Sequence, residues 1–292
     1  MSAAVIKRIG AEAIATKGRW RAIQWLVLRR AVQLGLLLLF LLGPWFGWWV
    51  VKGSLASSLT LGVLPLTDPY MLLQSLTARH WPESTALTGA LIVLGAYILV
   101  GGRVYCSWVC PVNLVTDTAQ WLRRRLGLGI GAPLKRATRY AILAATLVVS
   151  ALTGVVAWEL VNPVTILHRG LLFGLGLGGI AITAIFLFDL LIARRGWCGH
   201  LCPVGAFYAL LGRFSPLRVV ARRRRQCNDC LDCLTVCPEP QVIPPALKGE
   251  KRHIGPVINA GACTNCGRCI DVCSKNVFEF GTRFGNKLEA AT

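Results

Sequence analysis

Residues 227–238 read CNDCLDCLTVCP, and residues 263–274 repeat the same cysteine spacing as CTNCGRCIDVCS. Each stretch places three cysteines in one short loop and a fourth after three more residues, a C-x2-C-x2-C-x3-C pattern. Three thiolates in a tight loop can bind three irons of a [4Fe-4S] cluster, and the fourth ligand then comes from a more distant part of the chain. The paired pattern therefore predicts two [4Fe-4S] clusters.

This spacing resembles that of bacterial two-cluster ferredoxins, in which the fourth cysteine of each run crosses to the other cluster. We therefore predict a C-terminal α+β domain of the bacterial-type 2[4Fe-4S] ferredoxin fold. Ser274 stands where the first run has Pro238, and this difference touches no ligand. Cluster 1 is assigned to Cys227, Cys230, Cys233 and Cys273, and cluster 2 to Cys263, Cys266, Cys269 and Cys237.

Structural zinc is the alternative for these eight cysteines, because four-thiolate zinc sites are common. Such sites usually use two pairs of cysteines rather than a run of three plus one, so the spacing favours iron–sulfur clusters. Disulfides are disfavoured because the topology predicted below places this segment in a reducing cytoplasm.

The rest of the chain is apolar enough to predict an α-helical membrane protein. Of its 292 residues, 54% are hydrophobic and 15% are charged, and the mean hydropathy is +0.57. A transmembrane helix needs roughly 20 apolar residues to cross a hydrocarbon core of about 30 Å. Four transmembrane helices are therefore expected, at Ala31–Val51, Ala86–Tyr105, Tyr140–Val161 and Leu171–Ala193.

The basic residues predict the orientation of these helices. The chain has 32 Lys and Arg against 13 Asp and Glu, a net charge of +19. All but three of the 32 lie in residues 1–30, 103–139 and 194–292. Cytoplasmic loops carry the excess of Lys and Arg, so both termini are predicted to be cytoplasmic, and the charge does not indicate nucleic-acid binding.

Arg29 and Arg30 are interpreted as an anchor at the cytoplasmic surface. A twin-arginine export signal is the alternative, but the apolar run after them is too long and lacks a small-residue cleavage site. The predicted organisation is therefore a cytoplasmic N-terminal segment (1–30), a four-helix transmembrane domain (31–203) and a cytoplasmic ferredoxin-like domain (204–292).

Two C-x3-C-P motifs divide the predicted transmembrane domain into two repeats. CSWVCP begins at Cys106 and CGHLCP begins at Cys198, 92 residues later, each directly after an aromatic residue. Each helical hairpin also has a proline-containing outer loop, Thr67-Asp68-Pro69 in the first and Asn162-Pro163 in the second. The sequence thus predicts two parallel hairpin repeats related by an axis along the membrane normal.

The cysteines of these motifs are candidates for a third centre near the cytoplasmic face of the membrane. Residues i and i+4 share one face of a helix, so each motif can present two sulfurs in one direction. A third metal or iron–sulfur centre, a pair of redox dithiols and a packing role all remain open. His200, inside the second motif, is a further candidate ligand. The four cysteines are Cys106, Cys110, Cys198 and Cys202.

Taken together, these motifs resemble the NapH-type ferredoxin-like quinol dehydrogenase membrane subunit of periplasmic nitrate reductase systems. The resemblance rests on CSWVCP, GWCGHLCPVGA, the two ferredoxin runs, and the segments 24–30, 43–47 and 65–69. It implies a multi-pass protein of the bacterial inner membrane. It also implies a periplasmic ferredoxin-type iron–sulfur partner, with which the protein passes electrons from quinol toward periplasmic nitrate reductase.

Quinol oxidation needs proton-accepting groups beside an apolar slot near the membrane interface. The outer-side candidates are Asp68, His80, Glu83, Glu159 and His168, none of which stands in a diagnostic motif. Asp189, near the inner end of the fourth apolar stretch, is either a functional intramembrane acid or the ion-pair partner of Arg194 or Arg195. The run Arg222–Arg225 is interpreted as a lipid-facing anchor, with a docking patch for an acidic carrier as the alternative.

Three functions are compatible with the sequence. The first is a quinol-oxidising electron-transfer subunit, the second a maturation or repair reductase for a metal centre, and the third a membrane scaffold for an iron–sulfur partner. The sequence has no C-x-x-C-H haem motif and no nucleotide-binding fingerprint, which disfavours haem ligation and an ATP-driven or NADH-oxidising role. Quinol-dependent reduction of the clusters would separate the first function from the other two.

Overall fold

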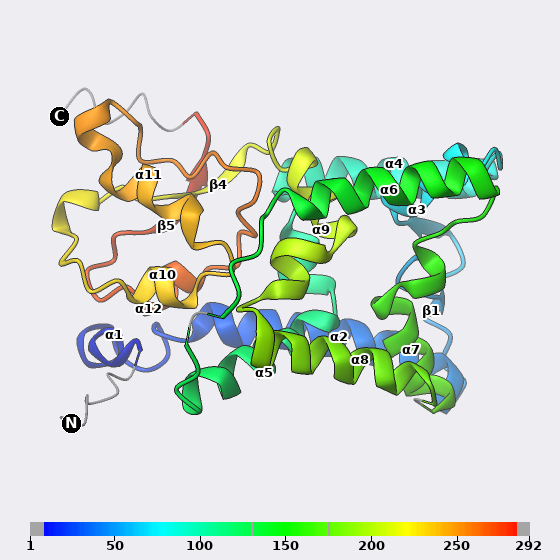
Figure 1. The fold of residues 1–292 in the computed structure, drawn as a ribbon, viewed down its shortest axis with the longest axis horizontal. Helices are drawn as coiled ribbons and strands as arrows, with labels where there is room; N and C mark the ends of the chain where they lie inside the picture. The colour runs from blue at the N-terminus through cyan, green and yellow to red at the C-terminus, as the bar shows by residue number, and fades with distance from the viewer. Residues whose placement is uncertain (1–8, 130, 175, 285–292) are drawn as a thin grey trace.

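The computed structural model describes residues 9–129, 131–174 and 176–284. A bundle of helices forms one end of the molecule. A smaller domain that contains both ferredoxin runs forms the other end and packs against the bundle (Figure 1). The helices of the bundle are α2 (Gln24–Phe46), α3 (Pro69–Thr77), α4 (Ser84–Val100), α5 (Val112–Arg125), α6 (Thr138–Thr153), α7 (Pro163–Phe173), α8 (Gly178–Leu187) and α9 (Pro203–Leu211).

Each repeat of the bundle contains a short helix that the sequence analysis did not predict. These helices, α3 and α7, begin at the two proline-containing segments expected to be outer loops. The side chains of Asp68 and Asn162 cap them by accepting hydrogen bonds from the backbone N–H groups of Tyr70 and Val164. Proline follows each cap, and its fixed φ suits the first position of a helix. Each repeat is therefore two longer helices with a short one between them.

The start of α3 lies inside the bundle. Tyr208 on α9 donates a hydrogen bond of 2.9 Å to Asp68. A sheet precedes α3 and lies at the end of the bundle away from the ferredoxin runs (Figure 1). Its antiparallel strands are β1 (Val51–Gly53), β2 (Ser57–Thr60) and β3 (Leu64–Thr67). The chain thus turns back from this end before α3 begins.

Among the described residues, one helix, α2, is long and apolar enough to cross a membrane. The other predicted spans coincide with the shorter apolar helices Ser84–Val100, Thr138–Thr153 and Gly178–Ile192. Four transmembrane helices therefore remain a prediction.

The predicted ends of all four spans were wrong. Val51 lies in β1 rather than in the first helix, and α4 ends at Val100, so Tyr105 lies in a separate π-turn. Helix α6 ends at Thr153 because Gly154 takes a left-handed conformation. The stretch Leu171–Ala193 is not one helix. It contains the end of α7 and the whole of α8, with positive φ angles at Gly174 and Gly176 between them.

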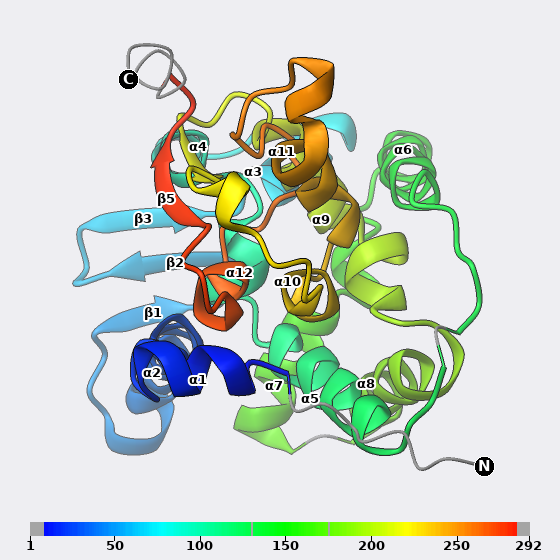
Figure 2. The same ribbon diagram turned by 90° about the vertical axis from the view of Figure 1, so that its left-hand side faces the viewer.

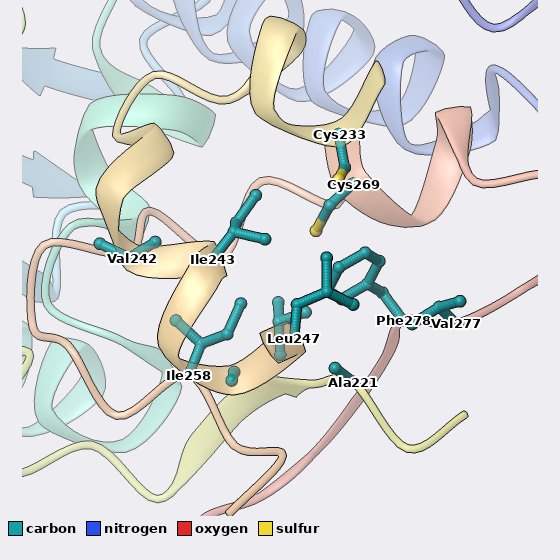
Figure 3. Packing of buried hydrophobic residues seen from close by; sticks show 11 residues of the cluster. Ala221, Cys233, Val242, Ile243, Leu247, Ile258, Cys269, Val277 and Phe278 are labelled. Atoms are coloured by element: carbon teal, nitrogen blue, oxygen red, sulfur yellow. The ribbon is translucent and has the colours of Figure 1, made fainter. Parts of the chain in front are cut away.

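The C-terminal domain is built around the two cysteine runs. Its elements are α10 (Asp232–Val236), α11 (Ile243–Lys248), α12 (Arg268–Val272) and the antiparallel pair β4 (Leu217–Val220) and β5 (Glu279–Thr282). Figure 3 shows Cys233 on α10 and Cys269 on α12 beside the apolar side chains of Ile243, Leu247 and Phe278. The hydrophobic core of such a small domain provides only marginal stability by itself. We therefore expect cluster binding to contribute to the folding of the domain.

The N-terminal segment belongs with this domain. Helix α1 (Ala11–Lys17) lies beside α12 (Figure 2). The backbone N–H of Gly10 donates to Asp232, and the Lys17 ammonium donates to the carbonyl of Ile270. At the other boundary, α9 falls in the range assigned above to the ferredoxin-like domain but packs against α6 of the bundle.

Two buried carboxylates connect the helical bundle to the C-terminal domain. Glu239, which is 1% exposed, accepts hydrogen bonds from Arg103 and from Arg139, the latter at 2.8 Å. On the other side of the junction, Asp117 of α5 pairs with Arg268 of α12. Because ion pairs buried in this way need both partners, the two parts are held in one fixed arrangement.

Candidate iron–sulfur centres

The two ferredoxin runs have matching backbones. In the first, Asp229 and Leu231 have φ angles of 55° and 62°. The corresponding Asn265 and Gly267 have φ angles of 45° and 70°. This left-handed backbone turns N–H groups toward the sulfurs, as the hydrogen bonds from Asp229 to Cys227 and from Asn265 to Cys263 illustrate. Loops of successive inward N–H groups favour anions such as thiolates and iron–sulfur clusters.

The four cysteines assigned to cluster 1 line one cavity. This cavity is closed by Leu247, Val277 and Phe278 of the domain core. Burial raises the pKa of the Cys233 thiol to about 12, and charges on Cys273, Cys230 and Cys227 act in the same direction. The last cysteine of the second run therefore lies with the first three of the first run, as the crossed assignment requires.

The four cysteines assigned to cluster 2 interact electrostatically with one another. Burial raises the pKa of Cys237, and the neighbouring charges of Cys266 and Cys263 raise it further. Burial also raises the pKa of Cys269, and the charges of Cys266, Cys237 and Cys263 act in the same direction. Four interacting thiols, of which Cys266 and Cys269 are buried, suit a centre that deprotonates its ligands, because metal coordination favours the thiolate.

The two C-x3-C-P motifs form π-turns rather than the α-helical turn that we expected. In each, the backbone N–H of the last cysteine bonds to the carbonyl of the residue before the first, from Cys110 to Tyr105 and from Cys202 to Trp197, both at 2.9 Å. Such π-turns are rare in proteins, and those that do occur are frequently found at functional sites. The matched geometry in the two motifs supports the predicted repeat.

All four cysteines of these motifs line a single cavity. Tyr105, Trp158 and Trp197 make up much of the rest of its wall. The backbone N–H groups at the starts of α5 and α9 donate to two of the sulfurs, Cys110 and Cys202. Helix N-termini favour negative charge, so this cavity suits an anionic group bound by thiolates. His200 does not line it.

None of these sets is arranged to hold a single metal ion. Within residues 9–129, 131–174 and 176–284, no group of three or more His, Cys, Asp or Glu side chains has the required geometry. The cluster 1 cysteines and the C-x3-C-P cysteines each line a cavity, which suits a cluster of several irons better than one tetrahedral zinc ion. All twelve cysteines are free thiols in this structure.

The second ferredoxin loop docks directly on the first C-x3-C loop. The hydroxyl of Ser107 donates to the carbonyl of Thr264 at 2.8 Å, and the Trp108 ring N–H donates to the carbonyl of Asn265 at 3.1 Å. These four residues lie between the cysteines of their respective motifs. The cysteines of cluster 2 and those of the bundle cavity are therefore held at a fixed separation.

Arg103 strengthens the same contact. Its guanidinium donates to the carbonyl of Cys198 at 3.0 Å and to the carbonyl of Ala262 at 3.1 Å, and it pairs with Glu239. It thus joins the second C-x3-C motif to the segment before Cys263. The roles of Arg103, Glu239 and Asp117 could not be predicted from the sequence, because no local pattern links charged residues that lie 78 to 151 positions apart.

The five quinol candidates do not form one site. The Glu159 carboxylate lies near enough to Asp68 for their charges to interact, and Glu159 accepts hydrogen bonds from Asn162 and Thr165. His80 and Glu83 are exposed, and His80 bonds to the carbonyl of Gly154.

His168 differs from the other four candidates. It lies on α7 with its ring edge toward Phe40 of α2, and the centroids of the two rings are 5.6 Å apart. The residue is 3% exposed, and its Nε2 has no hydrogen-bond partner. A buried ring nitrogen without a partner is costly unless a ligand satisfies it.

One further interpretation needs correction. Asp189 pairs with neither adjacent arginine; it accepts a hydrogen bond of 2.8 Å from the backbone N–H of Trp197, while Arg195 pairs with Asp117. Asp189 therefore positions the second C-x3-C motif. In the basic run Arg222–Arg225, Arg222 pairs with Glu279, and Arg224 and Arg225 pair with Glu250. The lipid-facing anchor stays a prediction.

Two protein families match this chain. The family described as "4Fe-4S binding domain" matches residues 85–129 and 175–225, which contain both C-x3-C-P motifs. The family described as "4Fe-4S dicluster domain" matches residues 226–277, which contain both ferredoxin runs. Iron–sulfur binding is therefore a property of the families that cover all twelve cysteines.

Curated relatives cover nearly the whole chain. Ferredoxin-type protein NapH of Escherichia coli is 49% identical over 95% of this chain and 96% of its own length. The methylamine utilization ferredoxin-type proteins MauN of Methylorubrum extorquens and Paracoccus denitrificans are 52% and 54% identical, over 97% and 93% of this chain and 98% and 95% of their own lengths. No solved structure matches. The chain belongs to the family of NapH-type and MauN-type ferredoxin-like iron–sulfur electron-transport proteins.

Proposed function

We propose that this protein is the membrane electron-transfer subunit of a quinol-oxidising system. In this proposal it lies in the bacterial inner membrane with both termini in the cytoplasm, and a periplasmic iron–sulfur partner takes part in delivering the electrons. Cluster 1 is held by Cys227, Cys230, Cys233 and Cys273, and cluster 2 by Cys237, Cys263, Cys266 and Cys269. When bound, such clusters supply one-electron redox chemistry.

The C-x3-C-P cysteines are proposed to hold a third iron–sulfur centre. The single cavity that all four line, the N–H groups of two helix N-termini directed at its sulfurs, and the 4Fe-4S family match over both motifs support this assignment. Redox dithiols are the alternative use of the same cysteines.

The observation that carries electron transfer is the docking of the 263–266 loop on the 106–110 loop. A scaffold needs the two parts joined anywhere on their surfaces, whereas electron transfer needs the cysteine sites themselves close together. Here the hydrogen bonds come from residues inside the cysteine motifs. This placement favours a redox role for both parts.

The proposed acceptor is the periplasmic nitrate reductase system, by analogy with NapH. The MauN relatives are at least as similar, and their name connects them with methylamine utilization. A methylamine-oxidising system is therefore the second candidate partner. The two candidates differ in the enzyme served and share the same membrane chemistry.

Among the quinol candidates, His168 is best placed to accept a hydrogen bond or proton from a bound hydroxyl group. It is buried between α7 and α2 with an unpartnered Nε2, whereas His80 is exposed and already bonded. These two histidines provide a matched pair for testing the quinol site.

The test is anaerobic reduction of the purified, iron-loaded protein by ubiquinol and menaquinol analogues, followed by low-temperature paramagnetic resonance. Quinol should reduce the wild-type clusters, His168→Gln should slow this reduction, and His80→Gln should not; dithionite should reduce all three proteins equally. Clusters that dithionite reduces and no quinol does would refute quinol oxidation. Loss of cofactor assembly in the partner enzyme of a deletion strain would then identify a maturation reductase.

A further inference from the structure

The two ferredoxin cysteine sets have different charge surroundings. Around the cluster 2 cysteines, Arg268 lies within the loop itself, and Arg29 reaches in from α2. Arg195 and Arg268 both act on Cys237. Around the cluster 1 cysteines, the interacting charges are those of the other cysteines and of two lysines: the half-buried Lys17, which interacts with Cys273, and the exposed Lys248, which pairs with Asp229. Buried positive charge is therefore concentrated on one side of the domain.

One carboxylate cannot neutralise this charge. Asp117 bonds to Arg30, Arg195 and Arg268, and Arg29 lies 4.0 Å from it. Burial acts to raise the pKa of Asp117, but the four guanidinium groups outweigh burial and hold it well below its usual value. A single negative charge thus faces four positive ones, and the group carries a net positive charge in the interior.

Arg29 is the arginine with the weakest compensation. The sequence analysis interpreted it as an anchor at the membrane surface, but it is 1% exposed and is surrounded by protein. Its Nε and Nη1 atoms have no hydrogen-bond partner. Burial of a guanidinium that shares one carboxylate with three other arginines is costly, and a second negative group nearby would offset this cost.

That negative group is the cluster 2 cysteine set. The packing places Arg29 beside this set. Helix α2 packs against α12, Arg29 lies 4.0 Å from Asp117, and Asp117 pairs with Arg268, which stands between Cys266 and Cys269. At this position the charge of Arg29 interacts with Cys266.

We propose that Arg29 tunes the redox potential of cluster 2 and makes it easier to reduce than cluster 1. Reduction adds negative charge, and a buried positive charge at short range stabilises the reduced form in a low-dielectric interior. Net charge and hydrogen bonding around the sulfurs are among the main determinants of cluster potential. The proposal rests on both cysteine sets holding clusters, as proposed above, and does not depend on quinol.

The experiment is a redox titration of both clusters in the intact, iron-loaded protein, with dyes and dithionite as reductants and paramagnetic resonance as the readout. In wild type, cluster 2 should titrate at a higher potential than cluster 1. In Arg29→Met, the reduced-to-oxidised ratio of cluster 2 at a fixed ambient potential should fall on the order of tenfold. Cluster 1 should not change, and Arg29→Lys, which keeps the charge, should lie near wild type.

Arg30→Met is the matched control. Arg30 is the next residue on α2, but its side chain is 25% exposed and contacts Asp117 directly, so its charge is screened and compensated. Its removal should shift cluster 2 much less. Should Arg29→Met lose iron, Asp117→Asn tests the same field with the opposite sign and should make cluster 2 easier to reduce.

Three results would overturn the inference: an unchanged cluster 2 potential in iron-replete Arg29→Met, an equal shift of both clusters, or an unchanged potential in Asp117→Asn. Absence of cluster signals from the wild-type protein would instead refute cluster binding itself.

Discussion

The spacing of the cysteines predicts which cysteines lie together, but it does not predict the charged residues around them. The spacing predicted that Cys273 would join the first three cysteines of the other run, and the structure brings it to their cavity. It could not predict Glu239 or Asp117, because the partners of each carboxylate come from separate helices. Nor could it distinguish Arg29 from Arg30, adjacent residues of which one is buried and the other partly exposed.

Single cysteine substitutions test the crossed ligand sets. Cys230→Ser should remove the signal of cluster 1 and Cys266→Ser that of cluster 2, because each cluster then has three thiolate ligands in place of four. Iron in the C-terminal domain should fall from at least eight atoms per chain to about four. Quantified iron and low-temperature paramagnetic resonance give both readouts; a variant that keeps both signals at full intensity contradicts the assignment.

Glu239 offers a test of the junction at a single residue. Glu239→Gln removes the charge shared by Arg103, Arg136 and Arg139 and leaves buried guanidinium groups uncompensated, which typically costs about 3–5 kcal/mol. Thermal unfolding followed by cluster absorbance should show this loss as a lower midpoint. The exposed pair of Arg222 with Glu279 supplies the control, since Glu279→Gln should cost at most about 1 kcal/mol. Equal effects of the two substitutions would mean that the junction does not depend on this carboxylate.

At the scale of elements, the repeat was predictable and its internal structure was not. The C-x3-C-P motifs, 92 residues apart, indicated two equivalent units, and both indeed form a π-turn followed by a helix. The short helices α3 and α7 escaped prediction because Asp68-Pro69 and Asn162-Pro163 look like turns. The same residues are good helix starts, since a capping side chain followed by proline suits both structures.

Substitutions at the two π-turns test whether their cysteines form one centre. If they share an iron–sulfur centre, Ser at Cys106, Cys110, Cys198 or Cys202 should each abolish the same signal. The Cys106/Cys198 double variant should be no worse than the singles, because the residues act as a unit. Separate dithiols would instead give additive effects in the double variant and unchanged iron. Iron content and quinol-driven electron transfer, measured for all five variants, decide between the two; full iron and full activity throughout would leave these cysteines with a packing role.

At the scale of the whole molecule, the fixed junction determines how the parts relate to the membrane. Ser107 of the first C-x3-C motif contacts the ferredoxin domain, Arg103 joins the second motif to the same domain, and the β1–β3 sheet lies at the opposite end of the bundle (Figure 1). The cavity lined by the four cysteines of these motifs extends inward to Asn162 and Pro163 at the start of α7. Hydrogen bonds and buried ion pairs thus connect both motifs to the ferredoxin side of the bundle. Whichever way the protein is oriented in the membrane, the cysteine motifs and the ferredoxin domain are therefore oriented together.

The distribution of basic residues predicts that this side is cytoplasmic. Of the 32 Lys and Arg, all but Lys52, Arg79 and Arg169 lie in residues 1–30, 103–139 and 194–292. Since Lys and Arg near helix ends are retained in the cytoplasm, a reporter fused after Thr292 should be active as a cytoplasmic reporter and silent as a periplasmic one. A fusion placed in the 78–83 loop should behave in the opposite way and serves as the control. A periplasmic reporter active after Thr292 would reverse the orientation and, because the junction is rigid, would move all twelve cysteines to the periplasmic side with it.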